Sequence, residues 1–190
     1  MVNEARTKLL PTIARLSPIL FLILTVINSL IYPSINSIYL VVAYISMMLA
    51  NFFAKNLVSR PLYNLFGKKE LPILGRGERP EGANSCGLVL DNKLSTSFGM
   101  PSGHSQLAWT VAIYLLAKLI SRTTMASGTK ILIAILIVGI ATYISYSRIY
   151  IDSCHTTEQV IFGSLIGGFG GFLIYYFEDM IIGLAKRFLL

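Results

Sequence analysis

The chain has 190 residues, of which 54% are hydrophobic and only 13% are charged, and its formal net charge is +7 at pH 7. Soluble domains carry about 25% charged residues, and the apolar residues here come in long runs. These properties exclude an ordinary soluble domain and indicate a single polytopic membrane domain over residues 1–190. The basic residues are spread over predicted loops, which argues against nucleic-acid binding and is typical of topology signals or anion binding.

The N-terminal part of the chain is predicted to form a helical hairpin in the membrane. A short interfacial segment over 1–16 precedes a first span over 18–32, which is short for a bilayer and is expected to borrow a turn from the residues before it. Pro33 and Ser34 make an uncharged turn. A second span over 35–54 completes the hairpin.

The segment 55–103 is the only long polar stretch of the chain. It contains seven basic residues, four prolines and seven glycines. Long loops in compact domains usually carry function. We therefore predict that this segment is a cap of the functional site rather than a merely solvated loop.

Three further spans are predicted in the second half of the chain. The last has Gly163, Gly167 and Gly171 at four-residue spacing, a small-residue stripe that lets another helix approach closely. The amphipathic tail over 177–190 is expected to lie on the membrane surface. The three spans cover residues 104–120, 131–147 and 155–176. The predicted fold class is all-α: a transmembrane helical bundle of about five spans with the long polar loop between the second and third.

Five spans place the loop after the second span and the loop after the fourth on the same side of the membrane. Eleven of the sixteen basic residues lie on that side or at the N-terminus, and the positive-inside rule would place it in the cytoplasm. The two cysteines, Cys86 and Cys154, lie on the same side. They either remain free thiols or, on an oxidising side, pair and tie the long loop to the later segment. Both questions stay open at the level of sequence.

The chemical signal of the sequence lies in the stretch 98–106, which reads FGMPSGHSQ, and in the only other histidine. Pro101 and Gly103 mark a turn that opens an apolar helix, and such a turn offers unpaired N–H groups and a positive dipole end to an anion. His104 lies in this turn, and His155 lies seven residues after Arg148, just before another apolar run.

These groups match the needs of phosphoryl transfer. The reaction requires cations and N–H donors around the phosphate oxygens, a nucleophile in line with the leaving oxygen and an acid to protonate it. Two histidines, two arginines, a lysine and a turn with N–H donors are sufficient without a cofactor or a metal. No cluster of His, Cys or carboxylate residues has the spacing of metal ligands.

The order PSGH at 101–104, Ser-Arg at 147–148 and His155 resembles the type 2 phosphatidic acid phosphatase superfamily, whose pattern is K-x6-RP, PSGH and SR-x5-H-x3-D. The wider matches FGMPSGHSQ, R-I-Y at 148–150 and H-T-x-x-Q-V at 155–160 are similar to the dolichyl-diphosphatases within it. The resemblance covers about residues 51–170.

The resemblance implies a role for each residue of the motifs. His155 would attack phosphorus and form a phosphohistidine, His104 would protonate the leaving group, and water would then release phosphate. Arg148 would clamp phosphate oxygens.

The remaining substrate-binding residues follow in the same way. Arg79 would join the clamp, and Ser102 and Gly103 would donate hydrogen bonds. Lys55 would complete the set at the end of the second span.

The first motif departs from the family pattern, because no Lys and Arg-Pro stand at the required spacing. We favour Lys55 and Arg79 with an insertion between them. Arg60, Lys69 and Arg76 remain rivals.

The last motif departs as well. Six residues rather than five separate Arg148 from His155, so a bulge or an irregular turn must absorb one. Gln159 stands where the family has an Asp that orients the imidazole, and its amide oxygen is expected to accept the ring N–H. Glu158 is an alternative partner, whereas Asp152 is interpreted as a loop residue rather than a catalytic acid.

The function implied is an integral membrane phosphatase of a polyprenyl (dolichyl-type) diphosphate, expected in the endoplasmic reticulum membrane, with a lipid phosphate as substrate and no cofactor. A phosphatase of phosphatidate or another lipid monophosphate is the alternative within the same chemistry. A non-catalytic lipid-phosphate transporter is the alternative from another class. The sequence leaves the lipid tail and the oligomeric state open.

Overall fold

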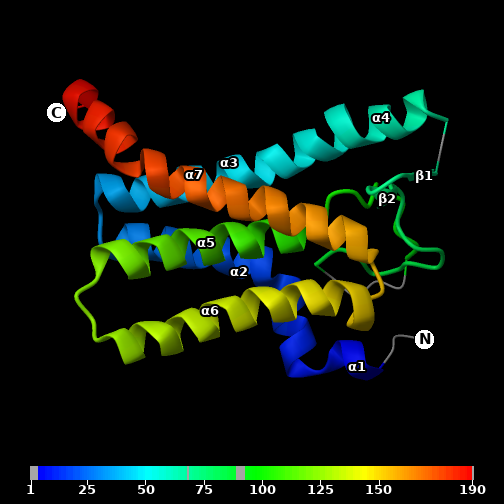
Figure 1. Cartoon of the computed structure of the whole chain (residues 1–190), viewed down its shortest axis with the longest axis horizontal. Helices are drawn as coiled ribbons and strands as arrows, with labels where there is room; N and C mark the ends of the chain where they lie inside the picture. Colours follow the sequence, from blue (N-terminus) through cyan, green and yellow to red (C-terminus); the bar gives the residue numbers. More distant parts are fainter. Residues whose placement is uncertain (1–3, 68, 89–92, 190) are drawn as a thin grey trace.

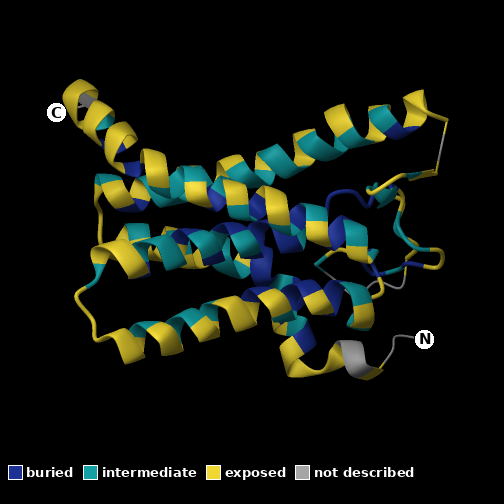
Figure 2. Cartoon of the chain, in the orientation of Figure 1, coloured by how far each residue is buried: buried dark blue, intermediate teal, exposed yellow. Residues whose placement is uncertain are grey.

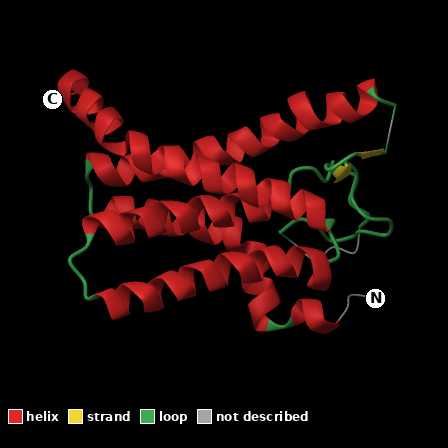
Figure 3. Cartoon of the chain, viewed as in Figure 1, coloured by secondary structure: helices red, strands yellow, loops and turns green. Residues whose placement is uncertain are grey.

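Long helices run side by side through most of the chain, and irregular segments gather at one end of them (Figures 1 and 3). The computed structural model describes residues 4–67, 69–88 and 93–189. The helices are α1 (Glu4–Thr7), α2 (Leu9–Ile31), α3 (Ile35–Phe53), α4 (Arg60–Leu65), α5 (Gly103–Arg122), α6 (Ser127–Tyr146) and α7 (Thr157–Leu189), with π-helical segments η1 (Ala54–Ser59) and η2 (Ser147–Ile151). Strands β1 (Glu70–Leu71) and β2 (Gly75–Arg76) pair antiparallel.

Four helical segments among the described residues are long and apolar enough to cross a membrane. They are Leu9–Ile31, Ile35–Leu65, Ser127–Ile151 and Thr157–Phe188. The helix α5 lies in the middle of the bundle, and eight of its residues are buried (Figure 2). Large apolar side chains cover the outer faces of the other helices, as expected where lipid replaces water. The structure is thus a mostly helical membrane protein, and five spans, counting α5, remain a prediction.

The first two helices are longer than the sequence indicated. The helix α2 begins at Leu9, which confirms that the first span borrows residues from the segment before it. The predicted loop over 55–103 begins too early, because η1 and α4 continue the helix of α3 to Leu65. Pro61 lies in the first turn of α4, directly after a π-helical turn, where a missing N–H is tolerated.

The predicted surface tail over 177–190 is not a separate element. These residues continue α7 without a break to Leu189. Figure 1 shows the end of α7 angled away from the bundle.

The glycine stripe of α7 packs directly against the backbone of α5. A Cβ added at Gly163 would collide with the carbonyl oxygen of Ser102, and one at Gly167 would collide with that of Gln106. Gly171 meets the backbone of Thr110 one turn further on. Three successive turns of α7 therefore touch α5 at backbone distance, which confirms the predicted packing role of the stripe.

The segments that carry the motifs meet at one end of the bundle. The loop after α4 and the junction between η2 and α7 lie at the same end in Figure 1. Cys86 and Cys154 form a disulfide across them, with their Cα atoms 5.5 Å apart. The alternative of two free thiols is thereby excluded in this structure.

Candidate active site

The candidate site is assembled from five separate segments at the loop-bearing end of the bundle. Each predicted site residue lies at the end of a helix or in the loop that covers these ends, so the helices fix the backbone positions. Lys55 comes from η1, Arg79 from the loop, Ser102, Gly103 and His104 from the start of α5, Arg148 from η2, and His155 from the turn before α7.

The imidazole of His155 is held in one orientation by Gln159. The Gln159 amide nitrogen donates to the backbone carbonyl oxygens of Arg76 at 2.8 Å and Glu78 at 2.7 Å. Its oxygen must therefore face His155 Nδ1, 2.9 Å away. An amide oxygen only accepts, so Nδ1 carries the ring hydrogen. The expectation that Gln159 rather than Glu158 partners the imidazole agrees with this geometry.

This tautomer leaves the lone pair of His155 on Nε2. Arg79 Nη1 lies 3.1 Å from that nitrogen and also donates to the carbonyl oxygen of Cys154 at 2.9 Å. The Nε of Arg79 donates to Ser97 Oγ at 3.0 Å. The guanidinium therefore lies next to the nitrogen that would attack a phosphate.

Burial and neighbouring charge keep this imidazole neutral. Desolvation, followed by the positive charge of Arg79, holds the pKa of His155 well below its usual range. Burial, followed by the charge of Arg148, lowers the pKa of Arg79 to about 10. At neutral pH the site therefore combines a neutral imidazole with a charged guanidinium.

Arg148 is fully buried and fixed at both ends of its guanidinium. Its Nη1 donates to Asp152 Oδ2 at 2.7 Å, and its Nη2 donates to the carbonyl oxygen of Cys86 at 2.8 Å. The π-helical turn of η2 holds one residue more than an α-helical turn would, which confirms the predicted irregularity between Arg148 and His155. The backbone N–H of His155 then donates to the carbonyl oxygen of Arg148 at 3.2 Å.

His104 is anchored to α2, a helix that the sequence had not connected with the site. Its Nε2 lies 2.9 Å from the carbonyl oxygen of Arg15. Because a carbonyl oxygen only accepts, Nε2 carries a hydrogen and Nδ1 is the nitrogen that gains or loses a proton.

The rival residues of the first motif lie in different surroundings. Arg60 and Lys69 are exposed. Arg76 forms an ion pair with Glu81 at 2.9 Å. Only Arg79 of these basic loop residues is seen to contact His155.

The side-chain amides of Asn51 and Gln106 connect α3 with α5, one helical turn before Lys55. Asn51 Nδ2 donates to Gln106 Oε1 at 2.7 Å, and the Gln106 amide nitrogen donates to the carbonyl oxygen of Met47 at 3.2 Å. Lys55 follows Asn51 by four residues and therefore projects from the same side of the helix.

The PSGH turn contributes fewer free donors than the sequence indicated. Ser102 is fully buried, and its backbone N–H donates to the carbonyl oxygen of Gln159 at 2.9 Å. Its hydroxyl oxygen accepts from Ser105 at 3.2 Å and keeps its own hydrogen to donate. Gly103 begins α5, where the first N–H groups of a helix have no partner within the helix.

The charges of the site do not balance. Arg148 is paired with Asp152. In the described part of the chain, no ion pair joins Lys55 or Arg79 to a carboxylate. The site therefore holds three basic side chains and two histidines but only one carboxylate, that of Asp152. Such an excess of positive charge favours an anionic ligand.

Several residues of this arrangement were missed by sequence reasoning. Asp152, interpreted as a loop residue, is fully buried and positions Arg148. Gly99 allows the Gln159 amide to lie against the loop, because an added Cβ would come within 2.6 Å of its nitrogen and oxygen. Asn51 and Gln106 carried a usable signal, since a buried amide inside an apolar helix requires a partner.

Comparison with known proteins identifies the family. The sequence profile of the PAP2 superfamily matches residues 36–182. The human protein Dolichyldiphosphatase 1 is 28% identical over 96 residues, which are 47% of this chain and 40% of that protein. Dolichyldiphosphatase 1 of Callithrix jacchus is 32% identical over 82 residues, 40% of this chain and 34% of that protein.

A bacterial protein is also similar to the chain. Lipid A 4'-phosphatase of Bacteroides thetaiotaomicron is 31% identical over 108 residues, 55% of this chain and 44% of that protein. The chain thus spans less than half the length of these curated relatives. No solved structure matches the chain. Because the profile covers far more than half of the chain and includes both histidine segments, the chain belongs to the PAP2 superfamily.

Proposed function

We propose that the protein hydrolyses a polyprenyl diphosphate of the dolichyl type, in a single membrane domain and through a phosphohistidine. The observation that carries the proposal is the His155 imidazole. Its Nδ1–H is fixed by Gln159, and its Nε2 lone pair lies beside Arg79. A neutral imidazole with a directed lone pair is a nucleophile, and the adjacent guanidinium suits the oxygens of the phosphate that it attacks.

In the proposed first step, His155 Nε2 forms a bond to the terminal phosphorus while the bond from that phosphorus to the bridging oxygen breaks. His104, which takes up a proton when the anionic substrate binds, gives its Nδ1 proton to the departing lipid monophosphate. Its Nε2–H stays on the carbonyl oxygen of Arg15 and keeps the ring oriented. Lys55, Arg79 and Arg148 balance the negative charge on the transferred group.

In the second step, a water molecule attacks the phosphohistidine and His104 takes a proton from it. The N–P bond breaks, and His155 returns to its neutral form as phosphate leaves. Because positive charge comes from Lys55, Arg79 and Arg148, the proposed reaction requires neither a metal ion nor a cofactor.

Two candidate substrates are favoured by the relatives. Similarity to proteins named Dolichyldiphosphatase 1 supports a polyprenyl diphosphate. Similarity to a protein named Lipid A 4'-phosphatase supports the second candidate, a lipid monophosphate. The same two-step chemistry acts on both, with an alkoxide oxygen as leaving group in the second case.

We place the protein in the endoplasmic reticulum membrane with the site on the non-cytoplasmic face. The Cys86–Cys154 disulfide supports this face, because disulfides persist in oxidising compartments. The disulfide outweighs the positive-inside count, since several of the basic residues on this side belong to the site.

The testing experiment measures phosphate release from a polyprenyl diphosphate in detergent with EDTA present. Wild type, His155→Ala and His104→Ala are compared, and phosphatidate and a polyprenyl monophosphate are run in parallel. We expect metal-free release by wild type and its loss in both variants.

A second measurement addresses the intermediate. Quenching at alkaline pH with substrate labelled in the terminal phosphate is expected to leave acid-labile label on wild type and none on His155→Ala. Wild type that releases no phosphate from any of these lipids, or variants as active as wild type, would overturn the catalytic proposal in favour of a transporter.

A further inference from the structure

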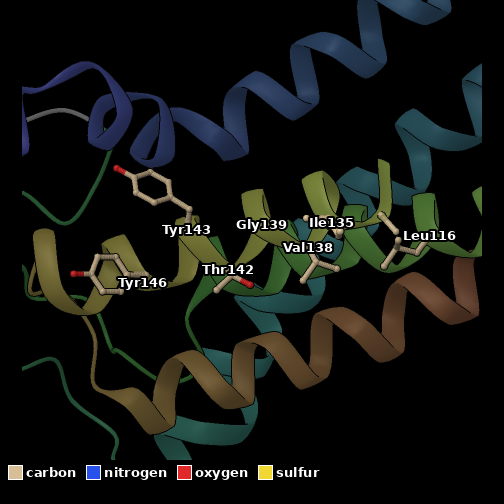
Figure 4. A pocket seen from close by; sticks show the side chains of 8 residues that line it. Leu116, Ile135, Val138, Gly139, Thr142, Tyr143 and Tyr146 are labelled. Atoms are coloured by element: carbon tan, nitrogen blue, oxygen red, sulfur yellow. The ribbon is translucent and has the colours of Figure 1, made fainter. Parts of the chain in front are cut away.

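An open apolar groove runs along α6 from the active-site end of the bundle. It consists of two cavities of about 660 and 720 Å³, which share Thr142 in their walls. The first lies among α5, α6 and α7, and the second lies between α5 and α6. Figure 4 shows the second, with Leu116 on α5 and Ile135, Val138 and Thr142 along α6.

The groove begins immediately next to the site. Ser145 and Val160 line its first cavity. Ser145 precedes Arg148 by three residues, and Val160 directly follows Gln159. A chain attached to a phosphate in the site would therefore meet the groove within about one helical turn.

Most of the wall of the groove is apolar, and two of its polar groups are engaged within the protein. Trp109 Nε1 donates to Ser145 Oγ at 3.2 Å, and Ser164 Oγ donates to the carbonyl oxygen of Val160 at 2.8 Å. Three more side chains with hydroxyl groups line the groove: Thr142, Tyr143 and Tyr146. The surface offered to a ligand is mainly hydrocarbon and aromatic rings, which suits a branched, unsaturated chain.

A smaller groove elsewhere provides the comparison. The cavity between α3 and α7, of about 440 Å³, reaches Ala50 near Lys55. It has less volume than either cavity on α6, and the cavity that shares Ala43 and Ile174 with it has only about 100 Å³. The α6 groove is therefore the better match to a long chain.

The length of the groove sets how much of a chain it holds. Its walls extend along α6 from Ala134 to Tyr146, a rise of about 18 Å at 1.5 Å per residue. An isoprene unit has four carbons along its chain and spans about 5 Å at bond lengths near 1.5 Å.

Building on the proposed function, we propose that the α5–α6–α7 groove binds the three isoprene units nearest the diphosphate of the substrate.

A larger side chain at Gly139 would fill the groove. Gly139 lines the second cavity, and a Cβ added there meets no atom within 4 Å. Gly139→Leu therefore projects a side chain into the groove without a clash in the protein. Gly183→Leu is the matched control, because Gly183 also lies in a helix with open space around it but outside the groove.

The activity test compares a C15 diphosphate, farnesyl diphosphate, with the C5 compound dimethylallyl diphosphate. Gly139→Leu is expected to lower kcat/KM for the C15 substrate by at least about tenfold, because two displaced methylene-sized groups already cost that much. It should leave the C5 substrate within about twofold, and Gly183→Leu should change neither. Equal effects of Gly139→Leu on both substrates, or none on either, overturn the proposal.

A binding test separates this inference from the catalytic proposal. A C15 diphosphate with a photoreactive terminal isoprene is cross-linked to the protein, and the labelled peptides are identified. Label on residues 134–146 and 160–169 that farnesyl diphosphate displaces, and that Gly139→Leu weakens, supports the groove even if no phosphate is released. Label near Ala50, or label that bulk lipid displaces equally well, overturns it.

Discussion

Replacement of Gln159 by Met would test how the nucleophile is held. The thioether has similar length but cannot accept the Nδ1–H of His155, which now lies 2.9 Å from the amide oxygen. Gln159 is fully buried, so water does not replace the lost acceptor. The imidazole would then be free to turn and to place its hydrogen on Nε2, the nitrogen that must attack.

The size of the effect follows from the hydrogen bonds that are lost. A buried donor left without a partner costs about 1–3 kcal/mol. If this cost adds to the activation free energy, kcat/KM falls by about five- to 150-fold, because about 1.4 kcal/mol corresponds to a factor of ten. The two lost bonds to the carbonyl oxygens of Arg76 and Glu78 would lower the free energy of unfolding by about 1–3 kcal/mol in total.

The assay is phosphate release as a function of pH, with thermal stability measured on the same samples. Gln159→Glu is the informative second variant, since a carboxylate beside Nδ1 raises the pKa of His155. The reaction requires the neutral imidazole, so activity falls as pH drops through this pKa. A raised pKa must therefore move the acid limb of the rate profile to higher pH. Full activity of Gln159→Met, or an unmoved acid limb in Gln159→Glu, would refute the role assigned to this amide.

Three further predictions concern the rest of the site and its support. Arg79→Lys keeps the charge but loses the shared Nη1 contacts, and kcat/KM is expected to fall about tenfold or more in the phosphate-release assay. The Cys86–Cys154 disulfide closes a loop of 68 residues, so its reduction should lower the free energy of unfolding by about 2–4 kcal/mol. In a melting experiment, the double variant Cys86→Ser, Cys154→Ser should not respond to reductant. Gly167→Ala should destabilise the protein by about 1–3 kcal/mol, because the added Cβ collides with the backbone of α5. Gly168→Ala should be neutral or stabilising, because its Cβ makes only an ordinary contact at 3.6 Å. Equal melting temperatures of the two variants would contradict the packing argument.

The sequence predicted what depends on composition and spacing. Apolar runs located the long helices, and the four-residue spacing of Gly163, Gly167 and Gly171 predicted the close helix contact. The extra residue between Arg148 and His155 predicted an irregular turn, because motif spacing translates directly into helix geometry. The convergence of these segments followed from counting spans.

The rest depended on tertiary contacts that leave no local pattern. His104 Nε2 contacts the backbone carbonyl oxygen of Arg15. Every residue carries such a carbonyl group, so the identity of residue 15 gives no sign of this contact. Asp152 does lie in the loop that follows η2, but its buried ion pair with Arg148 depends on the π-helical turn between them, which has no local sequence pattern. The end of the second span was placed too early, because Lys55 and Pro61 lie inside a helix that continues through η1 and α4 to Leu65.

The direct backbone contact between α5 and α7 has a consequence for how this molecule can vary. Each of the two histidines lies at the N-terminal end of one of these helices, so their separation is set by main-chain atoms that touch at Gly163, Gly167 and Gly171. Side chains elsewhere on the bundle can be exchanged for other apolar ones without altering the distance between the two histidines. Substrate range is therefore free to diverge on the lipid-facing helices while the chemistry stays constant, and admission of a substrate must involve α6, the loop or α2 rather than the α5–α7 pair.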